Sequence, residues 1–225
     1  MRRFLRRIAG TVLRTIRGGG TRDLEKVFTS HYTTNHWKDA ESVSGPGSTL
    51  AYTANLRREL PKLLDSLGVT SMLDAPCGDY NWFQHVRDAS AVEYTGGDIV
   101  EELVRRNRAR YGNASTHFVR LDITRDPLPA ADLLMCRDCL FHLAEQDIFR
   151  VLDNFRHSDI RWLLTSTHSK CERNVDISSG GFRELNLQLA PFALPEPVLM
   201  IDDWVEGFPV RQMALWEKLQ LVRRP

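Results

Sequence analysis

The chain has 225 residues, of which 42% are hydrophobic and 26% are charged, enough for one soluble domain with a sizeable core. It contains no apolar run of the roughly 18–20 residues that a transmembrane helix requires. The formal net charge is +1, but seven arginines fall within residues 1–22, and residues 23–225 carry a net charge of −6. This balance excludes a general basic surface for nucleic acid on the main part of the chain.

Residues 1–22 form a basic arm without acidic residues, and their pattern predicts an amphipathic helix that ends at the glycines 18–20. The apolar residues that share one helical stripe are Phe4, Leu5, Ile8, Val12, Leu13 and Ile16. Such an arm suits an anionic membrane surface or an arginine-rich targeting peptide, and it also suits a helix that packs on its own domain. The sequence leaves these three interpretations open.

The four cysteines are expected to be free thiols in a reducing cytoplasm, because a chain of this size does not depend on disulfides. Cys136 and Cys139 form a C-x-x-C pair, but no second pair follows it, so we expect the end of a strand and no metal site.

Residues 23–54 are expected to form a polar cap segment before the main domain. His36 and Trp37 are costly choices for an idle linker, and two glycines flank Pro46 in the run 42–48. The segment is therefore either a plain linker or a cover over a ligand crevice.

Residues 55–225 predict one α/β domain, because short β-rich runs alternate with segments of helical length. Helices are expected at 53–67, 81–89, 101–111 and 145–155. Strands are expected at 69–74, 93–98, 117–123, 132–137, 162–167, 198–203 and 212–221, and the last two form a hairpin. Residues 170–195 lack a helical period, and a loop of this length in a compact domain is usually functional or mobile.

Three aspartates, Asp74, Asp98 and Asp122, each end an apolar run, and 24 residues separate one from the next. In a parallel sheet the carboxyl ends of the strands lie along one edge, where ligands bind. We therefore expect the three carboxylates to converge on a polar, hydroxyl-bearing ligand.

The first strand is followed by small residues, which let a ligand approach the backbone closely. The turn has neither the G-x-G-x-x-G dinucleotide pattern nor the G-K-[ST] of a P-loop, which argues against a nicotinamide oxidoreductase. Asp98 follows the turn by about 20 residues, a spacing that suits a contact to ribose hydroxyls. Asp122 could accept from an exocyclic amine, or it could cap a turn with Thr124.

These residues together resemble the class I S-adenosylmethionine-dependent methyltransferases. The matching runs are 74–79, 97–98, 121–123 and 132–138. The runs 44–48, 74–79, 136–139 and 185–192 are similar to those of a bacterial subfamily of stand-alone methyltransferases. The resemblance implies a Rossmann-like, seven-stranded, mostly parallel sheet with helices on both faces and a C-terminal antiparallel hairpin. It also implies S-adenosyl-L-methionine as cofactor, and no metal.

The resemblance implies that the cofactor is bound by residues from the ends of four strands: Asp74, Ala75, Cys77, Gly78, Asp79, Trp82, Asp98, Ile99, Asp122, Ile123 and Arg137. The first motif departs from the family pattern D-x-G-x-G-x-G, because Pro76 and Tyr80 stand where glycines are usual. Asp79, Asn81 or Trp82 could therefore help to hold the methionine end.

A methyl acceptor with a hydroxyl group needs a base near neutral pH, and imidazole is the natural candidate. His142 and His168 both follow strands on the ligand edge, and Asp138 could orient the His142 ring if this segment is helical. Either histidine could instead be a surface or capping residue. Candidate acceptor-binding residues lie outside the sheet: His36, Trp37, Arg173 and Arg183.

The sequence thus favours a methyltransferase that acts on a hydroxyl of a small molecule or of a glycan, which could be lipid-linked. It would be cytoplasmic, with residues 1–20 as a possible contact to the inner face of the membrane. The alternative is a non-catalytic module that binds S-adenosylmethionine and docks a partner.

Overall fold

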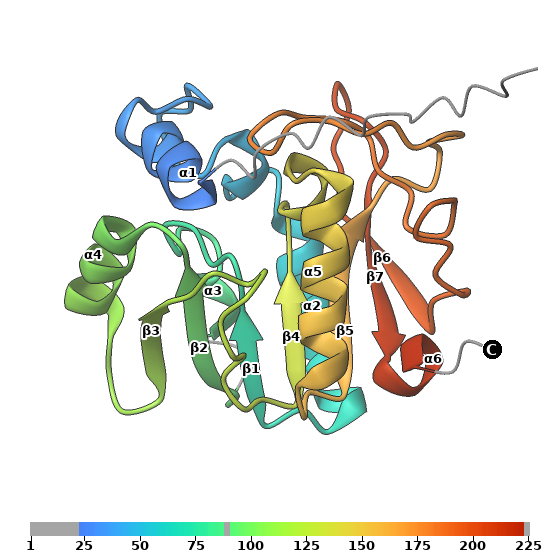
Figure 1. Cartoon of the computed structure of the whole chain (residues 1–225). Coiled ribbons are helices and arrows are strands. Elements are labelled where there is room, and N and C mark those ends of the chain that lie inside the picture. The colour runs from blue at the N-terminus through green and yellow to red at the C-terminus, as the bar shows by residue number, and fades with distance from the viewer. Residues whose placement is uncertain (1–22, 88–90, 223–225) are drawn as a thin grey trace, which may run out of the picture.

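A computed structural model describes residues 23–87 and 91–222, so the basic arm predicted for residues 1–22 lies outside the described residues. The described chain forms a seven-stranded sheet in the order β3-β2-β1-β4-β5-β7-β6 (Figure 1). The first five strands are parallel, and β7 pairs antiparallel with both β5 and β6. This is the sheet that the resemblance implied, and the C-terminal hairpin is confirmed.

The strands are short, as is usual for a sheet buried on both faces. Their bounds are β1 Ser71–Asp74, β2 Glu93–Asp98, β3 Thr116–Arg120, β4 Leu133–Cys136, β5 Trp162–Thr167, β6 Leu199–Asp202 and β7 Gln212–Glu217. The long helices are α2 Ala54–Leu67, α4 Glu101–Tyr111 and α5 Glu145–His157. The shorter elements are α1 Leu24–Thr33, α3 Gln84–Arg87, α6 Lys218–Val222 and the 3₁₀ turns Pro46–Ser48 and Leu140–His142.

The two faces of the sheet bury separate hydrophobic clusters, since successive side chains of a strand point to opposite faces. In β1, Leu73 packs with α5, whereas Met72 packs with α2. In β7, Trp216 joins the α5 cluster and Leu215 joins the α2 cluster. The central strands are therefore held on both sides, which fixes the edge where they end.

Local signals explain the helix boundaries. α2 ends at Gly68, which adopts the left-handed conformation with φ +63°, a position that favours glycine. α4 begins with Glu101 and Glu102 and ends with Arg108 and Arg110, charges that complement the helix dipole.

A long loop replaces the helix that usually follows the fifth strand. Residues 168–198, all of them described, contain no helix. The loop nevertheless buries Leu185, Leu187, Phe192 and Leu194 in the α5 cluster. It is an ordered part of the core, because it brings four large apolar side chains to the face that a helix would otherwise cover.

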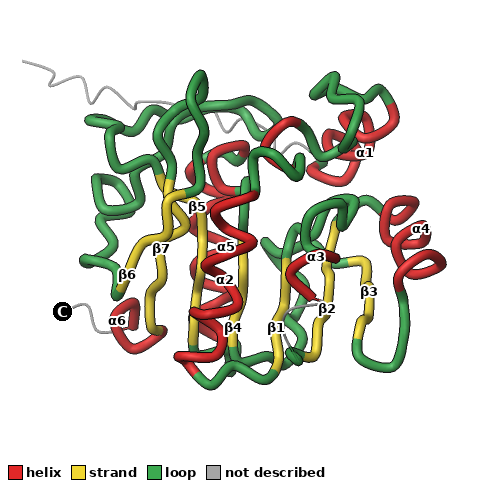
Figure 2. The backbone as a smooth tube through the Cα atoms, turned by 180° about the vertical axis from the view of Figure 1, so that it is seen from behind, coloured by secondary structure: helices red, strands yellow, loops and turns green. Residues whose placement is uncertain are grey.

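No helix is predicted in the cap segment from the sequence, but the structure has α1 there. Asp23 caps α1 by accepting from the backbone N–H of Lys26, and Leu24 and Phe28 pack on the core cluster. None of the ten α1 residues, all of which are described, is fully buried. Figures 1 and 2 show α1 above the edge where the parallel strands end, so the cap segment covers this edge.

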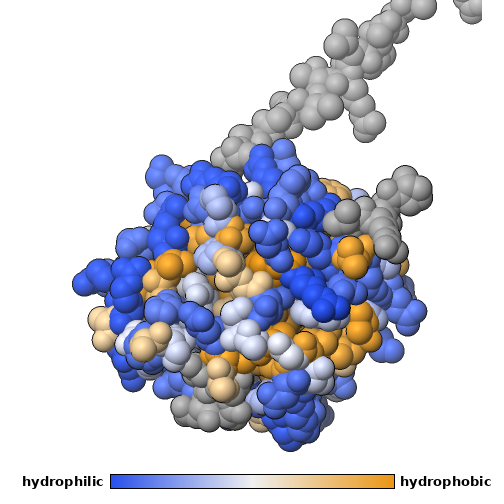
Figure 3. Space-filling model, turned by 90° about the horizontal axis from the view of Figure 1, so that it is seen from below, coloured by the Kyte–Doolittle hydropathy of each residue, from blue (hydrophilic) through white to orange (hydrophobic). Residues whose placement is uncertain are grey.

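None of the helices in the described part of the chain combines the length and the apolar run that a membrane crossing requires. Figure 3 shows the face opposite α1, where hydrophilic and hydrophobic residues are interspersed.

Candidate active site

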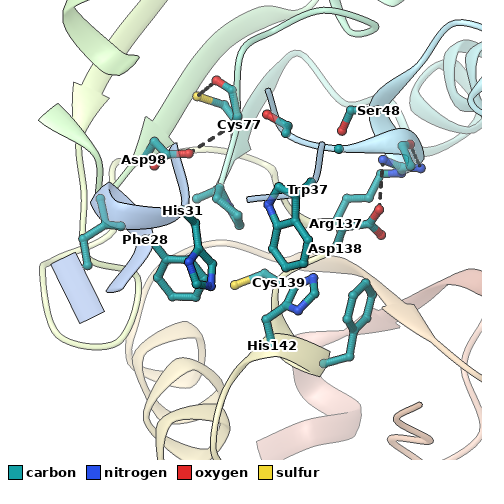
Figure 4. Close-up of a pocket in the computed structure, with 18 of the residues that line it drawn as sticks. Phe28, His31, Trp37, Ser48, Cys77, Asp98, Arg137, Asp138, Cys139 and His142 are labelled. Carbon is teal, nitrogen blue, oxygen red and sulfur yellow. Dashed lines mark hydrogen bonds and ion pairs between the residues drawn. The ribbon is translucent and has the colours of Figure 1, made fainter. Parts of the chain in front are cut away.

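A cavity of about 310 Å³ lies between α1 and the carboxyl ends of β1, β2, β4 and β5. Its wall includes most of the predicted cofactor residues: Asp74, Ala75, Cys77, Gly78, Trp82, Asp98, Ile99, Asp122, Ile123 and Arg137. It also includes four other predicted site residues: Trp37, Asp138, His142 and His168. The strand ends and the cap segment thus share one cavity (Figure 4).

Asp98 is held by backbone amides at the end of β2. Its Oδ2 accepts from the Gly78 N–H at 3.1 Å, and its Oδ1 accepts from the Val100 N–H at 3.0 Å. Each oxygen keeps a further lone pair, so the carboxylate can also accept from two ligand hydroxyls. Burial raises the pKa of Asp98 to about 6, against these hydrogen bonds.

Asp74 is the most strongly perturbed carboxyl group of the cavity wall. Burial raises its pKa to about 8, and the hydrogen bond of 2.7 Å from the Tyr94 hydroxyl to Oδ2 acts in the opposite direction. Its Oδ1 is buried and has no hydrogen-bond partner among the described residues. A buried oxygen without a hydrogen-bond partner in a cavity wall is suited to bind a polar group of a ligand.

Asp122 works mainly as a cap in this structure. Its Oδ1 accepts from the N–H and the hydroxyl of Thr124, and its Oδ2 pairs with Arg125 at 2.9 Å. The carboxylate lies in the cavity wall, but protein groups already contact both oxygens.

Asp79 does not line the cavity, in contrast to its predicted cofactor contact. Its carboxylate instead accepts from the hydroxyls of Ser42 and Ser44 and from the Val43 N–H. Gly78 has φ +56°, and a Cβ there would lie 2.4 Å from the Ser44 hydroxyl oxygen. Asp79 and Gly78 therefore fasten the cap segment onto the turn after β1.

Three buried charges and the partly buried Asp138 connect β4 to the last hairpin. Asp203 accepts from Arg137 Nε at 2.9 Å and from Arg211 Nη2 at 3.0 Å. Asp138 pairs with both arginines, at 3.3 and 2.9 Å. Arg137 also donates to the Gly47 carbonyl at 2.7 Å, so its guanidinium is committed to the protein rather than free for a ligand carboxylate.

His142 is half-buried, and its Nδ1 lies 2.7 Å from the Gly181 carbonyl oxygen. A carbonyl only accepts, so Nδ1 carries the proton and Nε2 keeps a lone pair. The prediction that Asp138 orients this ring is wrong: Asp138 bonds to Ser166 and to the arginines, and the backbone of a distant loop holds the ring. Burial lowers the pKa of His142 to about 4.

His168 is held in the opposite way. The Leu185 backbone N–H donates to its Nδ1 at 3.1 Å, so the proton lies on Nε2. The side chain is buried, and this burial lowers its pKa to about 4.

Aromatic rings surround the two histidines. The Trp37 ring lies 4.7 Å from the His142 ring, centroid to centroid, and is turned toward it (Figure 4). The Phe141 ring contacts both His142 and His168, at 4.5 and 5.2 Å. Phe182 completes this wall.

Three predicted acceptor-binding residues lie outside the cavity wall. His36 stacks on His31 at 4.0 Å, and Arg173 is exposed on the long loop. Arg183 is buried and donates to the carbonyls of Phe141 and Leu143, so it braces the turn that carries His142. The wall also contains residues that sequence reasoning missed: Phe28 and His31 on α1, Tyr52, Phe208 and Arg211.

Among the described residues, no group of three or more His, Cys, Asp or Glu side chains could hold a metal ion. Cys136 and Cys139 are buried free thiols at and just after the end of β4.

No protein-family model matches the chain, and no curated protein matches it. Solved structures do match. The 1,6-didemethyltoxoflavin-N1-methyltransferase of Burkholderia thailandensis, bound to S-adenosylhomocysteine, is 18% identical with a TM-score of 0.60, and the match covers 86% of each chain. The magnesium protoporphyrin IX methyltransferase of Synechocystis is 12% identical with a TM-score of 0.59, over 86% of this chain and 97% of that one.

A third match, human N-acetylserotonin methyltransferase in complex with S-adenosylmethionine, is 16% identical with a TM-score of 0.55. It covers 72% of this chain and 51% of that one, so the chain matches about half the length of that enzyme. The fold of the protein is that of the class I S-adenosylmethionine-dependent methyltransferases. The cavity contains two histidines whose protons are fixed by backbone groups.

Proposed function

We propose that the protein is an S-adenosylmethionine-dependent methyltransferase that methylates a hydroxyl group of a small molecule. One observation carries the proposal. A single cavity joins the strand-end carboxylates Asp74 and Asp98 to His142, whose Nε2 lone pair is available because its Nδ1 proton is bound to Gly181. Carboxylates that suit a hydroxylated ligand and a potential base for an acceptor are thus found in one compartment.

The residues of the cavity fit S-adenosylmethionine. Asp98 keeps lone pairs for the ribose hydroxyls, and the orphaned Oδ1 of Asp74 suits the amino group of the methionine part. Apolar side chains beside them suit a purine ring: Ile99, Val100, Leu103, Leu121 and Ile123. The turn after β1 is not arranged for phosphate, because the Gly78 N–H already donates to Asp98.

The bound cofactor would supply an electrophilic methyl group on its sulfonium. His142 would take the acceptor proton at Nε2, and the wall of Trp37, Phe141 and Phe182 would exclude water and orient the acceptor. The carboxylate of Asp138 favours the protonated imidazole and would stabilise it after proton transfer.

The proposal is tested by titration with S-adenosylmethionine in a calorimeter, followed by incubation with the methyl-labelled cofactor and native lysate fractions. We expect Asp98→Ala to abolish binding while the thermal unfolding transition persists, since Asp98 supplies the ribose contact. An unchanged affinity in Asp98→Ala would contradict the cofactor site. Binding without label in any fraction would favour the non-catalytic module.

We further propose that residues 1–20 bring the enzyme to an anionic bilayer on the cytoplasmic side. The support is the sequence: seven arginines and no acid in residues 1–22, which would attract anionic lipid by about 1 kcal/mol per arginine. Flotation with anionic and with zwitterionic vesicles tests the idea. Equal partitioning with and without residues 1–20 would refute it.

A further inference from the structure

We infer that His142 and His168 read two different oxygens of one acceptor, a flat aromatic compound with a hydroxyl for His142 and a second, hydrogen-bond-accepting oxygen for His168. This inference rests on the proposed function and specifies its substrate class. The carrying observation is that the two rings line one cavity with their protons on opposite nitrogens.

The backbone fixes the proton of His142. Its Nδ1 donates to the Gly181 carbonyl, while its own carbonyl accepts from the Gly180 N–H at 2.8 Å. Arg183 binds the carbonyls of Phe141 and Leu143 on either side of it. The backbone carbonyls of three successive residues, 141 to 143, are thus bound, which fixes the place of the ring. Because Nδ1 carries the proton, Nε2 can act only as an acceptor while the ring is neutral.

The backbone fixes the proton of His168 in the reverse sense. The Leu185 N–H donates to Nδ1, and the His168 N–H donates to the Leu185 carbonyl at 2.7 Å. Only Nε2 can then carry the proton. This Nε2–H has no hydrogen-bond partner within the residues that the structure describes, and His168 lines the cavity. An unpaired donor in the wall calls for an acceptor on the ligand.

The surroundings of the two rings favour an aromatic acceptor. Phe141 contacts both imidazoles, Phe182 lies near both, and Trp37 faces His142. Flat rings are the natural complement of such a wall. A weak base needs an acidic hydroxyl, and His142, with its pKa lowered to about 4, is much better matched to a phenol of pKa about 10 than to a sugar hydroxyl.

Methyl transfer to four probes tests the substrate class: 2-hydroxyacetophenone, 4-hydroxyacetophenone, phenol and methyl glucoside. We expect at least one hydroxyacetophenone to be methylated on oxygen with a kcat/KM about tenfold above that of phenol. A factor of about ten is what one additional hydrogen bond to the substrate contributes. Equal values for the ketones and phenol, transfer to methyl glucoside alone, or no transfer to any probe by protein that binds the cofactor would overturn the inference.

Two substitutions at His168 distinguish a role in binding the acceptor from a role in the stability of the fold. In His168→Asn the side-chain oxygen can still accept from the Leu185 N–H, but the donor into the cavity is lost. In His168→Gln the longer amide restores a donor near the Nε2 position. We expect His168→Asn to melt close to the native protein and lose the preference for the ketone, and His168→Gln to keep part of it. A preference that survives in His168→Asn would assign the second oxygen elsewhere.

Imidazole ¹⁵N spectra of the full-length protein test the two tautomers without any acceptor. The His168 signals are identified by their loss in His168→Asn, and the His142 signals by their loss in His142→Gln. We expect the proton on Nε2 of His168 and on Nδ1 of His142, and the reverse at either ring would overturn the inference. Because this result needs no turnover, it is distinct from a failure of cofactor binding or of label transfer.

Discussion

At the scale of single residues, burial separates the two carboxyl groups that face the cofactor side of the cavity. Backbone N–H groups donate to Asp98, which has a pKa of about 6, whereas Asp74 accepts from the Tyr94 hydroxyl and has a pKa of about 8. Asp74 is therefore largely protonated at neutral pH in the free protein, and it would ionise when a cationic group binds beside it.

Asp74→Asn is expected to flatten the pH dependence of stability between about pH 7.5 and 8.5. The folded-state pKa of Asp74 lies far above its unfolded value of 3.8, so the folded state binds more protons in this window and stability falls as pH rises. Asparagine does not ionise, so that fall should disappear. Thermal melts of the free protein across the window give the measurement.

Asp65→Asn, at an exposed position on α2, is the matched control and should leave the slope unchanged. The window lies above the folded-state pKa values of His142, His168 and Asp98, and above the value of 6.5 that the two histidines have in the unfolded chain, so these groups do not mask the effect. An Asp74→Asn protein with the native slope would show that Asp74 is ionised in the free protein.

His142→Gln is expected to lower kcat by about 10² to 10⁴, the usual contribution of a general base, with little change in cofactor affinity. In the native enzyme the base must be neutral, and its pKa is about 4, so activity should fall only below about pH 5. A pH profile of kcat/KM gives the check. A fall near pH 6.5 would indicate a solvated histidine instead.

The residues of the site divide into those that the sequence could predict and those that it could not. Asp74, Asp98 and His142 follow strands, so the βα pattern alone places them at the ligand edge. Two partners were missed, Gly181 of His142 and Asp203 of Arg137, since they lie 39 and 66 positions further along the chain. No local pattern specifies contacts at that separation.

At the scale of elements, the strands and the long helices lie where the periodicity predicts them, whereas α1 and α6 were not predicted. Residues 218–221, predicted as the end of the last strand, belong to α6. The helix 101–111 and the strand 162–167 are predicted with their correct ends. α1 has a weak apolar stripe and no fully buried residue among its ten described positions. The available signal for the start of α1 was a capping aspartate, Asp23, followed by an acidic first turn. This signal is weak, because such residues are common in loops as well.

Gly180→Ala should loosen α1. Gly180 has φ +96°, and a Cβ there would lie 2.4 Å from Val27 Cγ1 on α1, close to the His31 ring that bonds to the Gly180 carbonyl. Limited proteolysis within α1 and the melting temperature are the measurements, and both should change. Backbone strain alone costs about 1–3 kcal/mol at such a position.

Gly207→Ala provides the control for that strain. Gly207 has φ +91°, but nothing lies within 4 Å of the position that its Cβ would take. Cleavage within α1 should rise in Gly180→Ala alone. Equal cleavage in the two variants would mean that Gly180 does not dock α1.

At the scale of the whole molecule, one charged network joins three regions that are distant in sequence. It consists of the buried Arg137, Asp203 and Arg211 and the partly buried Asp138. They connect the end of β4, the turn at Gly47 and the last hairpin. The guanidinium groups also lie over Tyr52, 5.9 and 5.0 Å from its ring centre. The cap segment and the C-terminal hairpin are thus held to the sheet by the same group of side chains.

Asp203→Asn is expected to destabilise the protein by about 3–5 kcal/mol, because it removes the more deeply buried of the two carboxylates that the buried guanidinium groups share and leaves them only Asp138. Urea unfolding measures the change. Asp153→Asn is the control, because the Asp153 side chain is 59% exposed and pairs with Arg156 at the surface. Its loss should lower the free energy of unfolding by less than about 1 kcal/mol. Similar losses in the two variants would contradict a central role for the buried network.

The backbone contact that orients His142 affects how the site can change during evolution. Its orientation depends on the carbonyl of residue 181, and every amino acid has a carbonyl. A point mutation at that position alters the side chain but cannot delete the acceptor. The same loop also supplies Phe182 to the cavity wall, so the wall can diversify toward new acceptors while the proton stays on the same nitrogen.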